Sequence, residues 1–222
     1  MQQWAALIDL AIGRHCLDCG RVGQVWCDRC LHRVLDVHPR LTPGGQSVVA
    51  AARYAGSVPT AIVAHKEQGH LALAAPLGRL LVAAMVVPPE GVGRSAPVLV
   101  PVPSTRAASR TRGQDHARRL ARAVGALTAL PVEPALRWSR QVHDQAALSA
   151  RSRSENVRHA MSASPPPRVG ARAWLVDDVM TTGATLDEGV RALETAGWPV
   201  AGVSVVATVD ARSALARRDG LR

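Results

Sequence analysis

The stretch that decides the fold is residues 174–186, which read WLVDDVMTTGATL. It begins as an apolar strand, places Asp177 and Asp178 side by side at the strand's end, and then turns through small hydroxyl residues and Gly183. We expect a helix to begin at Ala184. The first N–H groups of a helix have no partners within the helix, and the helix dipole adds about half a positive charge there. The stretch therefore predicts a site for a phosphate monoester.

The other side chains of this stretch indicate that the phosphate belongs to a sugar. Three threonines add hydroxyl donors, and Gly183 lets the backbone approach a ligand without a Cβ in the way. Two carboxylates would repel a phosphate, so they must serve another part of the ligand, and ribose hydroxyls can donate to them. The alternative is a strand and a capped helix without a ligand. It is disfavoured because adjacent acids at a buried strand end are costly without a partner.

Two acids, a short spacer and T-T-G-A-T together resemble the phosphoribosyl pyrophosphate (PRPP) motif of type I phosphoribosyltransferases. The resemblance implies an α/β fold, in which a parallel sheet is flanked by helices. It also implies that Asp177 and Asp178 form the catalytic pair and contact the 2′- and 3′-hydroxyls of the ribose. The 5′-phosphate of PRPP would be held by the loop residues Thr181, Thr182, Gly183, Ala184 and Thr185.

The four cysteines lie within fifteen residues, as two pairs with the spacing C-x2-C: Cys16 with Cys19, and Cys27 with Cys30. Two such pairs are typical of a structural Zn2+ site with four thiolate ligands. Disulfides are an alternative, but they are rare in cytoplasmic proteins. A redox dithiol is a second alternative. The duplication of the pair favours the structural metal site, so we expect a small zinc-binding module at the N-terminus.

A four-cysteine module followed by a PRPP motif resembles the ComF family of competence-associated phosphoribosyltransferase-like proteins. Lys66 and Gly69 match the K-x-x-G of that family, and residues 101–103 match its P-V-P segment. The chain departs from the family at residues 112–117. ComF proteins usually read R-G-F-N-Q-A there, whereas this chain reads RGQDHA, so the Phe, Asn and Gln are replaced.

The segment after P-V-P corresponds to the pyrophosphate loop of the family. Hydroxyls and arginines at a strand end also suit pyrophosphate on chemical grounds, and a basic loop could close over PRPP and exclude water. We therefore expect the pyrophosphate to be bound by Lys66, Ser104, Thr105, Arg106 and Arg112. A Pro-rich turn and a solvated basic helix start are the alternatives for this region.

The composition describes a chain that can bury a core and that favours anionic partners. Of 222 residues, 47% are hydrophobic but only 3% are aromatic, so the core must consist mainly of Leu, Val and Ala. The formal net charge is +10, and Lys66 is the only lysine among 27 basic residues. Such an arginine bias is typical of a GC-rich genome, so part of the positive charge reflects genome composition rather than function. The remainder favours polyphosphate or nucleic-acid ligands.

The length indicates one medium-sized domain, or one domain with a small appendage. We expect a helix and the four-cysteine zinc module at residues 1–40. A phosphoribosyltransferase-like domain should span 46–212, and a basic tail 213–222.

Two features of the sequence bear on where in the cell the protein is located. Residues 71–89 are apolar, but Pro76 and Arg79 interrupt them, so we expect no membrane span. No basic and apolar leader with a cleavage site follows Met1, and we expect a cytoplasmic protein.

Strands and helices alternate along the rest of the chain, which indicates a parallel sheet with right-handed crossovers. We expect strands at residues 48–54, 98–103, 132–138, 174–178 and 200–209. We expect helices at residues 1–14, 58–66, 71–87, 113–130, 149–160 and 184–196. Residues 38–45 and 162–170 read as connectors.

Two main hypotheses of function remain open, beside a weaker third, a purely structural zinc-dependent partner protein. The first is a phosphoribosyltransferase that uses Mg2+ with PRPP and releases pyrophosphate, acting on an unknown nitrogen acceptor. The second, which the ComF resemblance implies, is a non-catalytic PRPP- or nucleotide-responsive protein that handles single-stranded DNA or competence proteins. Aromatic residues are few and are not interleaved with basic ones, which weakens a single-stranded DNA interface.

Overall fold

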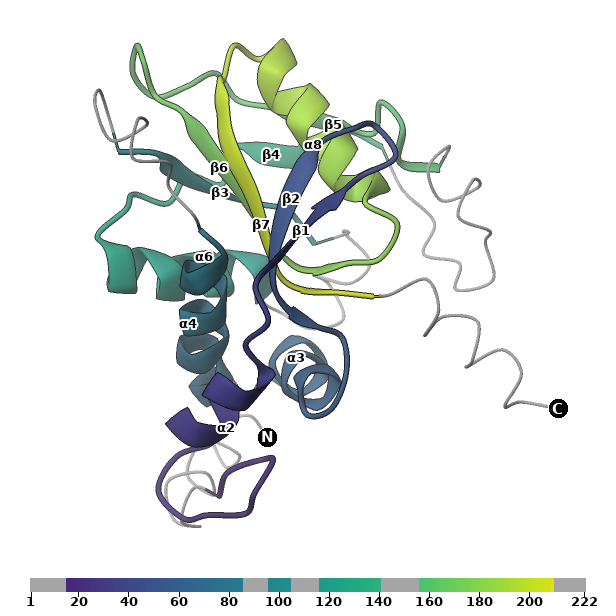
Figure 1. The fold of residues 1–222 in the computed structure, drawn as a ribbon. Coiled ribbons are helices and arrows are strands. Elements are labelled where there is room, and N and C mark those ends of the chain that lie inside the picture. The colour runs from purple at the N-terminus through teal and green to yellow at the C-terminus, as the bar shows by residue number, and fades with distance from the viewer. Residues whose placement is uncertain (1–14, 86–95, 105–115, 141–155, 210–222) are drawn as a thin grey trace, which may run out of the picture.

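The computed structural model describes residues 15–85, 96–104, 116–140 and 156–209, which form an α/β fold (Figure 1). Its main sheet has five strands in the order β1-β2-β7-β6-β3. These strands are β1 (His38–Leu41), β2 (Ser47–Arg53), β7 (Val200–Thr208), β6 (Ala173–Met180) and β3 (Val98–Pro101). The edge strand β1 runs antiparallel to β2, and all other neighbours are parallel. The predicted fold class, a mainly parallel sheet flanked by helices, is confirmed.

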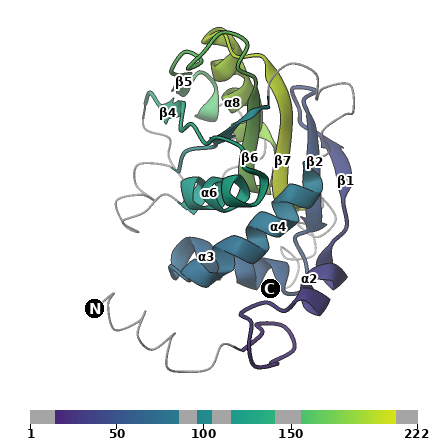
Figure 2. The same ribbon diagram turned by 90° about the vertical axis from the view of Figure 1, so that its left-hand side faces the viewer.

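Helices cover both faces of the sheet. Figure 1 and Figure 2 show α3, α4 and α6 on one face and α8 on the other. The helices are α2 (Asp28–Val34), α3 (Val58–Glu67), α4 (Ala74–Ala84), α6 (His116–Thr128) and α8 (Ala184–Thr195), with a 3-10 turn η1 (Leu71–Leu73) before α4. In the described part of the chain, no helix has the length and apolar character needed to cross a membrane.

The strands of the centre are apolar because both faces of the sheet are covered. All four residues of β3 are buried, and so are the first four of β6. Successive side chains of β6 divide between the two layers: Trp174 and Val176 pack with α3, α4 and α6, whereas Leu175 packs with α8. Continuous apolar runs of this kind are typical of parallel strands. Asp177 and Asp178 follow directly, so the motif places its carboxyls where the continuous apolar run of the strand ends.

A second, two-stranded sheet lies beside α8 and was not expected from the sequence. Its strands are β4 (Leu136–Trp138) and β5 (Met161–Ala163), which pair antiparallel. The sequence pattern predicts a strand over residues 132–138 and a helix that ends near residue 160. The observed β4 is shorter, and Val132 instead bridges to Leu99 of β3. The pairing of β4 with β5 is a tertiary contact, which the local sequence pattern does not encode.

The strand β1 corrects a second expectation. The sequence predicts a connector at residues 38–45, but part of this segment forms a strand. His38 pairs with Ala50 and Leu41 with Ser47, so β1 and β2 form a hairpin. Pro39 is compatible with this strand because β1 lies at the edge of the sheet, where the missing N–H costs nothing. The turn of this hairpin reaches the phosphate motif, as described below.

The boundaries expected for the domains stay predictions. The helix expected at residues 1–14, most of the helix at 149–160 and the tail at 213–222 lie outside the described residues. The cysteine segment packs against the main body, since Trp26, Cys30 and Leu31 share one apolar cluster with α3 and α4.

Candidate functional site

The strands β3 and β6 bring the two candidate parts of the site together. They are parallel neighbours, with Pro101 opposite Val176, and the Val102 N–H donates to the Val176 carbonyl over 3.0 Å. Ser104 follows β3, and the acidic pair follows Val176, so all three lie at the same edge of the sheet. Ligands of parallel α/β sheets bind at the carboxyl ends of the strands.

The turn from β6 into α8 has the backbone shape expected for a phosphate loop. Gly183 is the N-cap of α8, has φ +84°, and provides no side-chain cap. Thr181 is exposed, and Thr182 and Thr185 are half-buried, whereas Gly183 and Ala184 are buried. The Ala184 N–H points to the Thr182 hydroxyl over a long 3.4 Å, and Gly183 itself adds no capping side chain. The N-terminus of α8 is therefore suited to an anion.

The hairpin turn between β1 and β2 lies directly against this loop. The Thr42 hydroxyl donates to Oδ1 of Asp187 in the first turn of α8, and the Gly44 N–H donates to Oδ2 over 2.9 Å. A Cβ on Gly183 would lie 2.8 Å from Cγ2 of Thr42, which is closer than carbon atoms approach in proteins. The glycine is thus required by its positive φ and by its packing. The sequence reasoning missed Thr42 and Asp187.

Asp178 is buried and is held by two basic side chains. The Nζ of Lys66 lies 3.2 Å from its Oδ2, and the Nε2 of His116 lies 3.3 Å from the same atom. No described group is aligned with Oδ2 as a hydrogen bond, so these contacts are electrostatic. Burial would raise the pKa of Asp178, but His116 and Lys66 outweigh it and hold this pKa well below its usual range. Asp178 is therefore ionised.

Asp177 has different surroundings. It is half-buried, and its Oδ1 accepts the backbone N–H of Asp178 over 2.8 Å. Burial and the neighbouring Asp178 carboxylate raise the pKa of Asp177 well above its ordinary value, and the charge of Lys66 compensates only in part. The two adjacent acids thus differ in their surroundings: two basic side chains stabilise the charge of Asp178, whereas the charge of Asp177 is disfavoured.

Two buried histidines complete the surroundings of Asp178, and the sequence reasoning missed both. His116 is 5% exposed, and its Nδ1 lies 3.0 Å from the Ser104 hydroxyl. His65 is 2% exposed, and its Nε2 has no hydrogen-bond partner among the described residues. Burial, followed by the charges of Arg119 and His116, lowers the pKa of His65 to about 4. The replacement of the ComF Gln by His at position 116 was the one available signal.

The structure thus brings together two of the five residues expected to bind pyrophosphate, Lys66 and Ser104. Lys66 contacts Asp178, and Ser104 is linked to the same carboxylate through His116. Thr105, Arg106 and Arg112 lie outside the described residues. The roles of all these residues in ligand binding stay predictions.

The small β4–β5 sheet is fixed next to this site. The Trp138 indole N–H donates to the Pro103 carbonyl over 2.9 Å, which ties β4 to the segment before Ser104. On the other side, the buried Glu188 of α8 accepts the Met161 N–H over 2.8 Å and pairs with Arg191. These bonds hold β4 and β5 between the end of β3 and α8.

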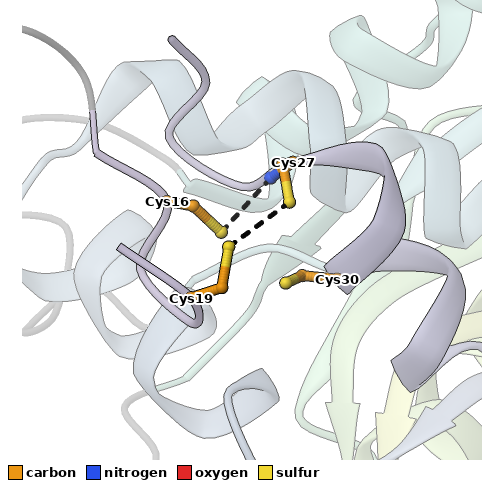
Figure 3. A group of neighbouring side chains, drawn as sticks. All are labelled: Cys16, Cys19, Cys27 and Cys30. Atoms are coloured by element: carbon orange, nitrogen blue, oxygen red, sulfur yellow. Dashed lines mark hydrogen bonds between the residues drawn. The ribbon is translucent and has the colours of Figure 1, made fainter. Parts of the chain in front are cut away.

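The four cysteines form a compact cluster (Figure 3). All are free thiols, and their Sγ atoms lie within 4.8 Å of one another. The Sγ atoms of Cys19 and Cys27 are 3.7 Å apart, and the Cys27 N–H points to Sγ of Cys16 over 3.4 Å. Tetrahedral Zn2+ with bonds of about 2.3 Å separates its sulfur ligands by roughly 3.8 Å. The cluster therefore fits a structural metal ion of this type.

The charges of the thiols agree with a bound cation. Burial would raise the pKa of Cys16, but backbone N–H groups of Cys19, Cys27 and Asp18 lower it to about 6. For Cys30, burial and the three neighbouring thiols all raise the pKa. Four adjacent thiolates repel one another, and a divalent cation would relieve this repulsion. In the described chain, no other group of three or more Cys, His, Asp or Glu residues could hold a metal ion.

The chain has short or distant similarity to several known proteins. No protein-family model matches the chain. The adenine phosphoribosyltransferase of Clavibacter sepedonicus is 47% identical over 53 residues, which cover 22% of this chain and 28% of that protein. The same enzyme of Clavibacter michiganensis subsp. michiganensis is 47% identical over 53 residues, which cover 22% of this chain and 30% of that protein. The match thus spans less than a third of the length of either relative.

Two solved structures overlap more of the chain at low similarity. The UMP synthase of Leishmania donovani covers 85% of this chain and 32% of its own, with 15% identity and a TM-score of 0.40. The overlap with the orotate phosphoribosyltransferase of Mycobacterium tuberculosis covers 86% of this chain and 90% of that protein, with 20% identity and a TM-score of 0.36. At these scores the overlaps add nothing to the fold described above. The local sequence match is to enzymes named as phosphoribosyltransferases.

Proposed function

We propose that the chain binds PRPP at the β6–α8 junction and transfers its phosphoribosyl group to a nitrogen acceptor, as a ComF-type phosphoribosyltransferase. The observation that carries this proposal is the order of groups at this junction: the acidic pair Asp177 and Asp178 is followed by the loop that ends at Gly183, and Lys66 contacts Asp178. It offers carboxylates to ribose hydroxyls and backbone N–H groups to the 5′-phosphate. The match of 53 residues to adenine phosphoribosyltransferases also supports it.

The reaction would be a displacement at C1 of the ribose. The acceptor nitrogen forms the new bond to C1 while the bond to the pyrophosphate oxygen breaks, with inversion and through an oxocarbenium-like state. Asp177 and Asp178 fix the ribose, and the fixed negative charge of Asp178 stabilises the positive charge that develops on the ring. The protein acts mainly by positioning and by electrostatics.

Mg2+ would enter with the donor. The described residues near Asp178 offer no group of three metal ligands, and Asp178 is already paired with Lys66 and His116. Mg2+ keeps most of its ligands outside the protein, and pyrophosphate and ribose oxygens are suitable ligands. When bound, it neutralises charge on the departing pyrophosphate.

The acceptor would lie between the acidic pair and the β4–β5 sheet, which Trp138 fixes beside Pro103. Pyrophosphate release from Mg·PRPP, with adenine and orotate among the tested acceptors, measures the transferase reaction directly. Release that depends on one acceptor supports the proposal. Tight PRPP binding without release in any acceptor panel would instead favour the non-catalytic function.

That second function, in which the protein responds to PRPP or a nucleotide and handles single-stranded DNA in competence, is favoured by the net charge of +10. If DNA phosphates are neutralised on binding, the logarithm of the affinity should fall steeply with the logarithm of the salt concentration. No binding of single-stranded oligonucleotide at low salt would rule this function out.

A further inference from the structure

The turn between β1 and β2 is joined to the first turn of α8 through the carboxylate of Asp187 (Figure 1). The Thr42 hydroxyl donates to its Oδ1, and the Gly44 N–H donates to its Oδ2 over 2.9 Å. Thr42 is 5% exposed, and Asp187 is half-buried. Both oxygens of this carboxylate are thus held by a turn that lies about 145 residues away in the sequence.

The hydrogen bonds within the turn direct the Thr42 hydroxyl toward Asp187. The Gln46 N–H donates to the hydroxyl oxygen over 3.0 Å, and the one hydroxyl proton is given to the carboxylate. The Gly45 N–H donates to the Thr42 carbonyl, and the Thr42 N–H donates to the Gln46 carbonyl, each over 3.0 Å. The N–H groups of these four residues are therefore used within the turn or by Asp187, so the turn acts on a ligand through α8.

Asp187 carries its charge close to the proposed site of the 5′-phosphate. Its own N–H donates to the Gly183 carbonyl over 3.0 Å, so it lies one helical turn beyond the end of the loop. A carboxylate in the first turn of a helix is attracted by the same N–H groups and the same dipole that attract a phosphate. Two such anions also repel each other. A freely rotating Asp187 carboxylate would therefore compete with the ligand.

We propose that Thr42 is a positioning residue for the 5′-phosphate. Its hydroxyl, together with the Gly44 N–H, holds the Asp187 carboxylate on the hairpin side of α8 and leaves the N-terminal N–H groups of the helix to the ligand. This inference rests on the proposed function and deepens it, because it names a side chain that sets the affinity for one half of the donor.

The experiment measures each half of the donor separately, by the displacement of Mg·PRPP with ribose 5-phosphate or with Mg·pyrophosphate. The test variant is Thr42→Val, which keeps the branched shape of the side chain and loses the hydroxyl. We expect its affinity for ribose 5-phosphate to fall about three- to tenfold, as is typical of a charge at a helix terminus. Its affinity for Mg·pyrophosphate should stay unchanged. Thr195→Val, the same change at an exposed position near the far end of α8, is the control for both ligands.

A second change in the same chain separates competition by charge from simple support of the fold. Asp187→Asn, added to Thr42→Val, removes the competing charge. The affinity of the double variant for ribose 5-phosphate should therefore return toward the wild-type value. If Thr42 only supports the fold, the double variant should bind no better than Thr42→Val, because it has lost both partners of the contact.

If Thr42→Val does not fold, Gly44→Ala takes its place. Gly44 has no positive φ, but a Cβ there would lie 2.7 Å from Oδ1 of Asp187, so the carboxylate must move while Thr42 remains. An unchanged affinity for ribose 5-phosphate, an equal loss for both ligands, or no recovery in the double variant overturns this inference and leaves the proposed function standing. No binding of Mg·PRPP to the wild-type protein overturns both.

Discussion

The backbone N–H of Asp178 donates to Oδ1 of Asp177 over 2.8 Å, yet the two carboxyls of this pair lie in different electrostatic surroundings. Asp178 has Lys66 and His116 beside it, whereas Asp177 has mainly the negative charge of Asp178. A ligand-binding site can retain such a strained charge because the ribose hydroxyls relieve it. The ligand-free protein should therefore be less stable than it would be with a side chain at position 177 that cannot ionise.

The first prediction concerns Asp177→Asn. The raised pKa of Asp177 penalises the folded state at every pH above the ordinary value of about 4, because the unfolded chain ionises more readily. Asn keeps an oxygen that can accept the Asp178 N–H. We expect Asp177→Asn to raise the Tm of the ligand-free protein at neutral pH by a few degrees, since about 1 kcal/mol corresponds to roughly 2–4 °C at this size.

The same variant should lose affinity for PRPP, so stability and binding should change in opposite directions. Glu194→Gln is the matched control, because it makes the same chemical change at an exposed position near the far end of α8. Differential scanning calorimetry measures both variants. An Asp177→Asn protein with a lower Tm than the control would contradict the account of the pair.

The second prediction concerns His65 and acid stability. Its pKa is about 4 in the folded protein against 6.5 in an exposed histidine, so only the unfolded chain binds this proton between those values. The stability that is present above pH 6.5 should therefore be lost as the pH falls toward 4. Between pH 7 and pH 5 we expect a loss on the order of 2 kcal/mol from this group.

Urea unfolding at the two pH values measures the effect, with His65→Leu as the test and His159→Asn as the exposed control. The pH dependence should be smaller in His65→Leu and unchanged in His159→Asn. If both variants keep the wild-type slope, His65 is not the group responsible.

The third prediction compares two glycines with the same backbone conformation. Gly183 has φ +84° and Gly197 has φ +86°, but only a Cβ on Gly183 meets a neighbour, 2.8 Å away in Thr42. Both Ala variants bear the strain of a positive φ, about 1 kcal/mol. Gly183→Ala must also displace the β1–β2 turn from the phosphate loop. We expect it to lower the Tm more than Gly197→Ala and to weaken PRPP binding at least tenfold.

PRPP binding by Gly197→Ala should match the wild-type protein, because Gly197 lies beyond the other end of α8. Equal losses of binding in the two variants would mean that the Gly183 turn does not hold the ligand.

The fourth prediction concerns removal of the metal from the cysteine cluster. Cys30 is 1% exposed and belongs to the apolar cluster that includes α3 and α4, so loss of the ion should destabilise more than the N-terminal segment. We expect about one Zn2+ per chain by elemental analysis, and a fall in Tm with a strong chelator or with Cys30→Ser. Arg29→Ala, at the exposed neighbouring position, should keep the metal and the Tm. A metal-free protein with unchanged Tm would contradict the zinc site.

Much of the fold could be predicted from the chain because its signals are local. The apolar runs of β3 and β6 and the turn at Gly183 depend on neighbouring residues, and their positions agree with the structure within a few residues. The spacing of the cysteines likewise predicted their cluster. The strand β5 could not be predicted, because it depends on distant partners: β4 and the carboxylate of Glu188.

The candidate site divides in the same way. Lys66 was expected near the donor, and the structure places it on Asp178. His116 and Thr42 contribute through side chains that come from elsewhere in the sequence, with no motif of their own. Their roles depend on how α6 and the β1–β2 hairpin pack, which only the structure shows.

The most direct test of the central claim is the thermal shift produced by Mg·PRPP, compared between the wild-type protein and Asp177→Asn/Asp178→Asn, each relative to its own ligand-free Tm. A ligand that binds only the folded state stabilises it by an amount that grows with the logarithm of the ligand concentration over Kd, about 2.7 kcal/mol at a hundredfold excess. We predict a clear upward shift for the wild-type protein and for Glu194→Gln, and none for the double variant. A shift of equal size in the double variant, or no shift in the wild-type protein, would contradict the assignment of the β6–α8 junction as the PRPP site.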